Sequence, residues 1–176
     1  MDMRRTAQGI STALLAALWL AGCGGAVTTS PSNTGGAQSA QPTTVLALDT
    51  AGSLPAGATI GGLGVTVNLP ESVSIKTDGS GNVDSGVVTA SGVAAGQATV
   101  ITLYSAAAGT VPAKLHIVLA SGSAGMTVGE FATITCTVAS GGAPTASDFS
   151  LSDFTSVNTL GDTIPSLTAD LRTIEP

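Results

Sequence analysis

The stretch Leu63-Gly64-Val65-Thr66-Val67-Asn68-Leu69-Pro70 decides the fold, because aliphatic residues alternate strictly with small or polar ones along it. Successive side chains of a β-strand point to opposite faces, so the four aliphatic residues would share one face. Pro70 has no N–H to give to a ladder and would end the strand. The stretch therefore predicts a two-sided β-strand.

Short apolar runs of the same kind recur on both sides of this stretch, with Gly, Pro, Asn and Asp turn signals between them. They lie at 45–48, 73–77, 87–89, 98–104, 115–119, 131–138, 149–151 and 167–171. The one helix-friendly run, 106–108, is stopped by Gly109 and Pro112. About nine strands without a helix predict an all-β sandwich over residues 43–176.

Two of these runs predict how their strands are placed. The run 98–104 is apolar on both faces, so we expect a central strand there. In the run 131–138, Cys136 shares a face with alanine, isoleucine and valine, while Phe131 falls on the face of the threonines. Cys136 is therefore expected to be a buried small hydrophobic residue.

The charge pattern limits the classes of partner. The chain of 176 residues has a net charge of −6, and beyond residue 22 its only bases are Lys76, Lys114 and Arg172. Without a basic patch, nucleic acids and anionic lipid surfaces are poor partners.

The N-terminal segment has the pattern of a secretory signal. Arg4 and Arg5 precede an apolar run, 13–21, which is too short to span a bilayer. It ends in Leu20-Ala21-Gly22-Cys23, which resembles the lipobox of bacterial lipoproteins. That resemblance implies cleavage after residue 22 and lipid attachment at Cys23, hence anchoring in the cell envelope. The alternative is an ordinary signal peptide with an incidental cysteine.

Two further features concern the anchored state. Lipoproteins retained in the inner membrane often carry aspartate after the cysteine, and Gly24 in that place implies the outer membrane. Residues 23–42 are rich in Gly, Ser, Thr and Pro and predict a flexible tether.

Three stretches of the sandwich region resemble the cohesin domain, a nine-stranded jelly roll. They are 63–70, the passage from Lys114 through Gly129-Glu130 to Thr135, and 149–154 with the final strand. Cohesins share a superfamily with some carbohydrate-binding modules, so the resemblance implies binding and no enzymatic activity. Cohesins usually sit in scaffold chains beside other modules. This sequence departs from that pattern, since we expect one such domain in it and no enzyme module.

Few residues suggest chemistry. No catalytic or nucleotide-binding motif occurs, and the single histidine, His116, has no evident partner for acid–base work. Alternating oxygen ligands at Asp78, Ser80, Asn82 and Asp84 suggest a calcium loop. However, Val83 stands where such loops need glycine, which favours a polar hairpin turn and no cofactor. Asp148, Asp153 and Asp162 are expected to be solvated carboxylates at strand ends.

A sugar-binding face would need exposed aromatic side chains. Tyr104 and Phe131 are the candidates for such positions, with partial burial at a sandwich edge as the favoured alternative. The leading hypothesis is a lipid-anchored domain that binds a protein partner through a sheet face; the alternatives are polysaccharide binding and a structural envelope role. A flat face of apolar residues, Ser and Thr would favour a protein partner, and a row of exposed aromatics would favour a glycan.

Overall fold

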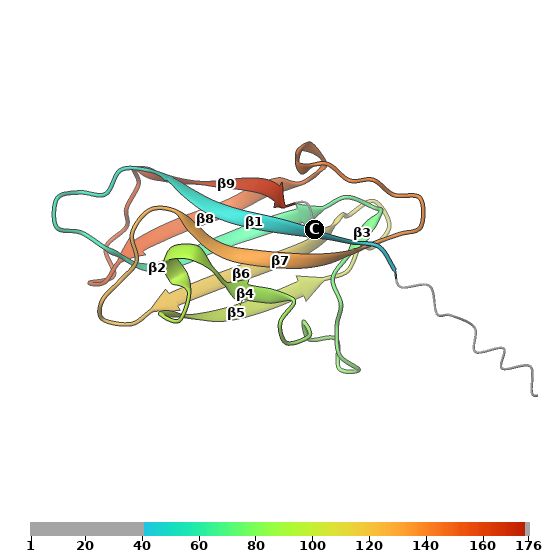
Figure 1. Cartoon of the computed structure of the whole chain (residues 1–176), viewed down its shortest axis with the longest axis horizontal. Helices are drawn as coiled ribbons and strands as arrows, with labels where there is room; N and C mark the ends of the chain where they lie inside the picture. Colours follow the sequence, from blue (N-terminus) through green and yellow to red (C-terminus); the bar gives the residue numbers. More distant parts are fainter. Residues whose placement is uncertain (1–40, 175–176) are drawn as a thin grey trace, which may run out of the picture. The chain divides into compact units, whose positions relative to one another are not determined.

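The computed structural model describes residues 41–174, which belong to a compact unit, Ser39–Pro176. Nine strands form two antiparallel sheets packed face to face (Figure 1), which confirms an all-β sandwich. The strands are β1 (Thr43–Gly52), β2 (Ile60–Leu69), β3 (Val73–Ser74), β4 (Val88–Ala90), β5 (Ala98–Ser105), β6 (Ala113–Ser121), β7 (Glu130–Val138), β8 (Ser150–Asn158) and β9 (Leu167–Ile174). Two short 3₁₀-helices, η1 (Gly92–Ala94) and η2 (Ala146–Asp148), lie in the connections.

The expected signal peptide, the lipid-attachment residue Cys23 and the tether up to residue 40 lie outside the described residues. Within 41–174, no helix is long and apolar enough to cross a membrane.

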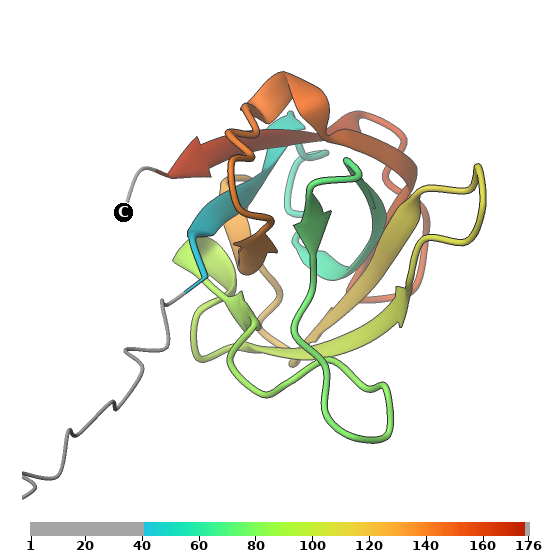
Figure 2. The same cartoon turned by 90° about the vertical axis from the view of Figure 1, so that its right-hand side faces the viewer.

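Each sheet has two central strands, which are paired on both sides. The five-stranded sheet has the order β3-β7-β1-β9, and β4 also pairs with β7. The four-stranded sheet has the order β5-β6-β2-β8. Figure 2, which looks along the sandwich, shows how these two layers enclose the interior. Strand β2, which contains the stretch 63–70, is thus bonded on both sides, to β6 and to β8.

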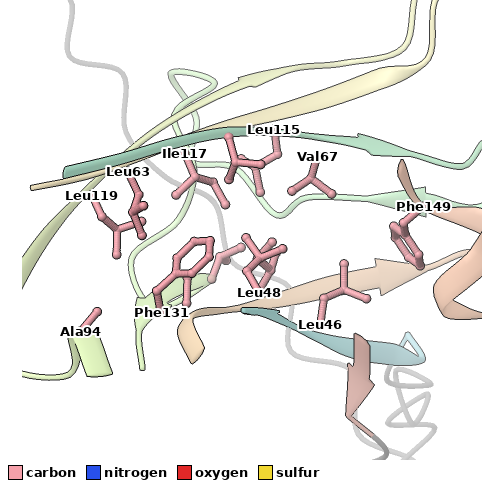
Figure 3. Close-up of a cluster of buried hydrophobic side chains, with 14 of the residues drawn as sticks. Leu46, Leu48, Leu63, Val67, Ala94, Leu115, Ile117, Leu119, Phe131 and Phe149 are labelled. Carbon is pink, nitrogen blue, oxygen red and sulfur yellow. The ribbon is translucent and has the colours of Figure 1, made fainter. Parts of the chain in front are cut away.

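The core lies between the sheets and is built from alternating residues of the central strands (Figure 3). Leu63, Val65, Val67 and Leu69 of β2 all point into it, as the alternation predicts. From the other sheet, Leu46 and Leu48 of β1 meet them. Cys136 is also buried, which confirms its predicted role as a small hydrophobic core residue.

The predicted orientation of Phe131 is wrong, and a β-bulge is the reason. In the pairing of β1 with β7, Leu48 lies opposite Ala132 while Asp49 lies opposite Glu130, so Phe131 is an extra residue in β7. A bulge of this kind interrupts the two-residue period of a strand. Phe131 and Ala132 are therefore both fully buried, and Phe131 has no accessible surface for a ligand.

The predicted central position of the strand at 98–104 is also wrong. β5 pairs only with β6 and forms the border of the four-stranded sheet. Its inward residues, such as Val100 and Tyr104, pack against the core but remain half-exposed. Its outward residues Ile101 and Leu103 are 61% and 67% exposed. The apolar character of both faces thus reflects an uncovered outer face.

Candidate functional site

The outer face of the four-stranded sheet is the most distinctive surface of residues 41–174. Strand pairing aligns its outward residues in four rows that cross β5, β6, β2 and β8 in turn, and the row at one end, Ser105-Lys114-Asn68-Ser150, carries a lysine. The other three rows are Thr99-Ala120-Gly62-Val157, Ile101-Val118-Gly64-Thr155 and Leu103-His116-Thr66-Ser152. These three rows contain aliphatic, glycine and hydroxyl residues together with His116, and they carry no carboxylate, lysine or arginine.

A shallow groove runs across this face where β2 has no side chains. Gly62 and Gly64 are outward positions of β2, flanked by Val118 of β6 and by Thr155 and Val157 of β8. The groove has a volume of about 350 Å³, and His116 stands at its border. A Cβ atom added at Gly62 would lie 3.2 Å from Cγ2 of Val157. The two glycines therefore keep the groove open.

The polar groups of this face are held by hydrogen bonds between strands. The Thr66 hydroxyl lies 3.0 Å from Nδ1 of His116 on the neighbouring strand. On the other side of β2, the Asn68 side-chain amide donates to the hydroxyls of Ser150 and Ser152. The half-buried imidazole is thus a fixed part of the surface beside the groove, and no carboxylate orients it among the described contacts.

The outer face of the five-stranded sheet differs from this surface. Arg172 of β9 reaches across β1, where its Nε donates to Asp49 at 3.0 Å, and its other end pairs with Glu130 of β7. Threonines fill the outward positions of β7. Such exposed ion pairs contribute little to stability. They do make this face charged and hydrated, so the apolar surface is confined to the other sheet.

The predicted calcium ligands lie in a hairpin turn whose acceptors are used internally. Oδ1 of Asp78 accepts the backbone N–H groups of Ser80 and Asn82 at 2.8 and 2.9 Å. Oδ2 of Asp84 instead pairs with Lys76 at 2.9 Å. No group of three or more His, Cys, Asp or Glu side chains suited to a metal ion occurs in the described part of the chain. The polar turn, the favoured alternative, is what these residues form.

The same turn occurs a second time after β8, which identifies the role of Asp78. There Oδ1 of Asn158 accepts the N–H groups of Leu160 and Asp162, both at 2.9 Å. The flanking backbone pairs, Thr77 with Val83 and Val157 with Thr163, are equivalent as well. The neutral amide of Asn158 accepts the same two backbone N–H groups in its turn as the carboxylate of Asp78 accepts in the other. Closing the turn therefore requires an acceptor oxygen and no charge.

We expect the substitution Asp78→Asn to leave the fold intact and to remove one pH-dependent contribution to stability. Hydrogen bonds from Asn82 and Ser80 hold the pKa of Asp78 below its usual value. A carboxyl with a lowered folded-state pKa stabilises the fold above its unfolded pKa, and this contribution is lost as the pH falls through the folded value. Thermal melts from neutral to acid pH should show the wild type more stable at neutral pH and the two proteins converging in acid. A constant difference at every pH would contradict this assignment.

The remaining predicted site residues lie apart from one another. Tyr104 is half-buried on the inward side of β5, which agrees with partial burial at a sandwich edge. Asp148 caps η2 by accepting from Thr145, which lowers its pKa, while Asp162 is bonded to Asn158. Asp153 accepts from the neighbouring Ser152 in β8. Burial raises the pKa of the Cys136 thiol to about 12, so it is protonated and inert at neutral pH.

Sequence reasoning missed the groove and the exposed aliphatic residues of this face. Two signals were present: the glycines at 62 and 64 occupy alternate positions of one strand, and the run 98–104 is apolar on both faces. Their meaning depends on which strands lie beside β2 and β5, and the pairing of β2 with β8 joins residues more than 80 positions apart.

Comparison with known proteins adds no relative. No protein-family model, no curated protein and no solved structure matches the chain.

Proposed function

We propose that this chain is a lipid-anchored protein of the cell envelope whose β-sandwich, a cohesin-like jelly roll, binds a protein partner through the outer face of the four-stranded sheet. The composition of that face supports the proposal, since three of its four rows consist of aliphatic, glycine and hydroxyl residues and His116 around a groove. Exposed Ile101 and Leu103 are the observation on which it rests. Apolar groups gathered on one face of a soluble domain are typical of an interaction surface.

The chemistry of the face defines the partner that would fit. A partner with aliphatic side chains on a nearly flat surface would cover Ile101 and Leu103 and place one side chain over Gly62 and Gly64. Fully burying one exposed aliphatic side chain contributes about 1.5–3 kcal/mol. Because the three rows around the groove carry no carboxylate, lysine or arginine, a partner that covers these rows desolvates no such charge. The hydroxyls of Thr155 and Ser152 would supply hydrogen bonds at the border.

The other proposals have less support. Glycan binding through stacked aromatics would have to do without Phe131, which lies in the core, and with a half-buried Tyr104. A purely structural envelope role does not account for an open groove beside exposed aliphatic residues. We propose no catalytic activity, cofactor or nucleic-acid partner, and we place the protein at the outer membrane through lipidated Cys23.

We expect the double substitution Ile101→Ser/Leu103→Ser to abolish capture of a stoichiometric protein partner by residues 39–176. Affinity should fall at least about tenfold for two lost aliphatic contacts. Leu160→Ser is the matched control, since Leu160 is 86% exposed in the turn after β8 and outside the three rows. The measurement is a pull-down from secreted and envelope proteins beside a polysaccharide panel, with and without calcium, followed by titration of the captured protein. Retention of a glycan alone, or equal capture by the double variant, would reject the proposal.

A further inference from the structure

Three of the four sheet borders in residues 41–174 carry features that prevent further strand pairing. β3 and β4 are only two and three residues long. β9 carries Asp170 and Arg172, and β8 has register shifts against β2 and a left-handed residue, Asp153, with φ of 53°. Short length, charge and irregular backbone are the usual ways in which proteins block edge-to-edge association.

The fourth border, β5, has none of these features. Its eight residues, Ala-Thr-Val-Ile-Thr-Leu-Tyr-Ser, include no charge, proline or glycine, and they pair with β6 in an unbroken register. Figure 1 shows β5 as the outermost strand beside β6. It is therefore a regular, uncharged and partly apolar edge.

The backbone of β5 offers unpaired groups along this edge. The N–H of Gly122 donates to the carbonyl of Gln97, so these two residues form a hydrogen-bonded pair at the end of the ladder between β5 and β6. Such pairs recur at every second residue of an antiparallel ladder, so the odd-numbered residues of β5 bond to β6. The backbone groups of Ala98, Val100, Thr102 and Tyr104 then point away from β6. Within the described chain, no hydrogen bond from another segment reaches them, even though β4 of the other sheet lies close by.

We propose that β5 pairs antiparallel with β5 of a second copy of this chain, forming a symmetric dimer with one continuous eight-stranded sheet. The strand is complementary to itself when the two-fold axis passes through Thr102. Ile101 then lies opposite Leu103 of the second copy, and Thr99 lies opposite Ser105. The hydrogen-bonded pairs of this register are the even-numbered residues, whose backbone groups are the unpaired ones.

Charge favours a second copy at this edge over contact elsewhere. The chain has a net charge of −6, and two copies repel each other wherever their carboxylates meet. β5 is uncharged along its whole length, so the pairing brings no carboxylates directly opposite each other. The dimer would also leave the outer faces of both copies open and side by side, so it stands independently of the proposed partner binding.

Sedimentation of residues 39–176 over a wide range of concentration tests the dimer. We expect the mass to double as the concentration rises, and Thr102→Pro to abolish the doubling because it removes the central outward N–H. Thr102→Ala, which keeps that N–H, is the matched control and should still dimerise. Thermal melts of each variant show whether it is folded. Because the Thr102 variants keep Ile101 and Leu103, we expect each copy to bind the proposed protein partner as the wild type does.

A second pair of variants tests the register without touching the backbone. Thr99→Glu/Ser105→Glu places glutamates opposite each other at two points, whereas Thr99→Lys/Ser105→Glu places opposite charges there. The two proteins differ only at position 99, and we expect the first to dimerise roughly tenfold more weakly than the second. A protein that stays monomeric throughout, a dimer that persists in Thr102→Pro, or equal association of the two charge variants would overturn the proposal.

Discussion

The substitution Phe131→Ala is expected to lower the free energy of unfolding by about 3–5 kcal/mol. Phe131 is fully buried and is the largest of the fully buried side chains. Its removal loses the transfer free energy of the ring and leaves a cavity that the two sheets can fill only in part, since both are held by ladders on either side of their central strands.

Urea denaturation of residues 39–176 measures this effect, with Phe154→Ala as the comparison. Phe154 is only partly buried and packs against the outside of the core, so its loss should be clearly smaller. Phe131→Leu retains most of the apolar volume, so its free energy of unfolding should lie between those of the wild type and Phe131→Ala. This variant can still be measured if Phe131→Ala does not fold. If Phe131→Ala lost no more free energy of unfolding than Phe154→Ala, the inward position that the bulge gives to the Phe131 ring would be contradicted.

The second large effect is expected for Gly52→Ala, at the end of β1. Gly52 has a φ of 112°, which an L-residue with a side chain rarely adopts, and it pairs with Leu167 at the start of β9. A Cβ atom there would overlap the carbonyl oxygen of Ser166, which belongs to the backbone and cannot move aside alone. Backbone strain of this kind costs about 1–3 kcal/mol before the overlap is added.

Gly57→Ala separates the two causes. Gly57 also has a positive φ, 76°, yet a Cβ atom there would meet nothing within 4 Å. Gly57→Ala should therefore lower the free energy of unfolding only by the cost of the backbone conformation, about 1 kcal/mol. Denaturation midpoints of the two variants give the comparison. Equal losses would mean that β9 does not approach Gly52 as closely as the structure has it.

The parts of the fold that depend on local pattern could be predicted from the sequence. The alternation 63–69 gave both the existence of β2 and its inward face, because a two-residue period leaves no other interpretation when one face is aliphatic. The turn at Asp78 was likewise predictable from its Gly, Ser and Asn content, since these residues favour turns wherever they occur.

The errors concern features that depend on how the strands pair with one another. Phe131 turns inward because β7 carries one more residue than β1 across their bulge, which no property of the run 131–138 reveals. The run 98–104 has the composition of a central strand, but β5 lies at a border because β6 is the one strand with which it pairs in the described residues. The candidate site could not be predicted for the same reason, because its rows join residues of four strands whose pairing the sequence does not reveal.

The position of β1 has a mechanical consequence. β1 is the first described strand, and it is bonded along most of its length to β7 on one side and to β9 on the other. A tensile load applied at Thr43 along the direction of β1 would act parallel to both of these ladders. Both ladders would then resist in shear, with many hydrogen bonds loaded at once, whereas a border strand pulled sideways would open one bond at a time. β1 is thus held by two ladders at once against a load along its own axis.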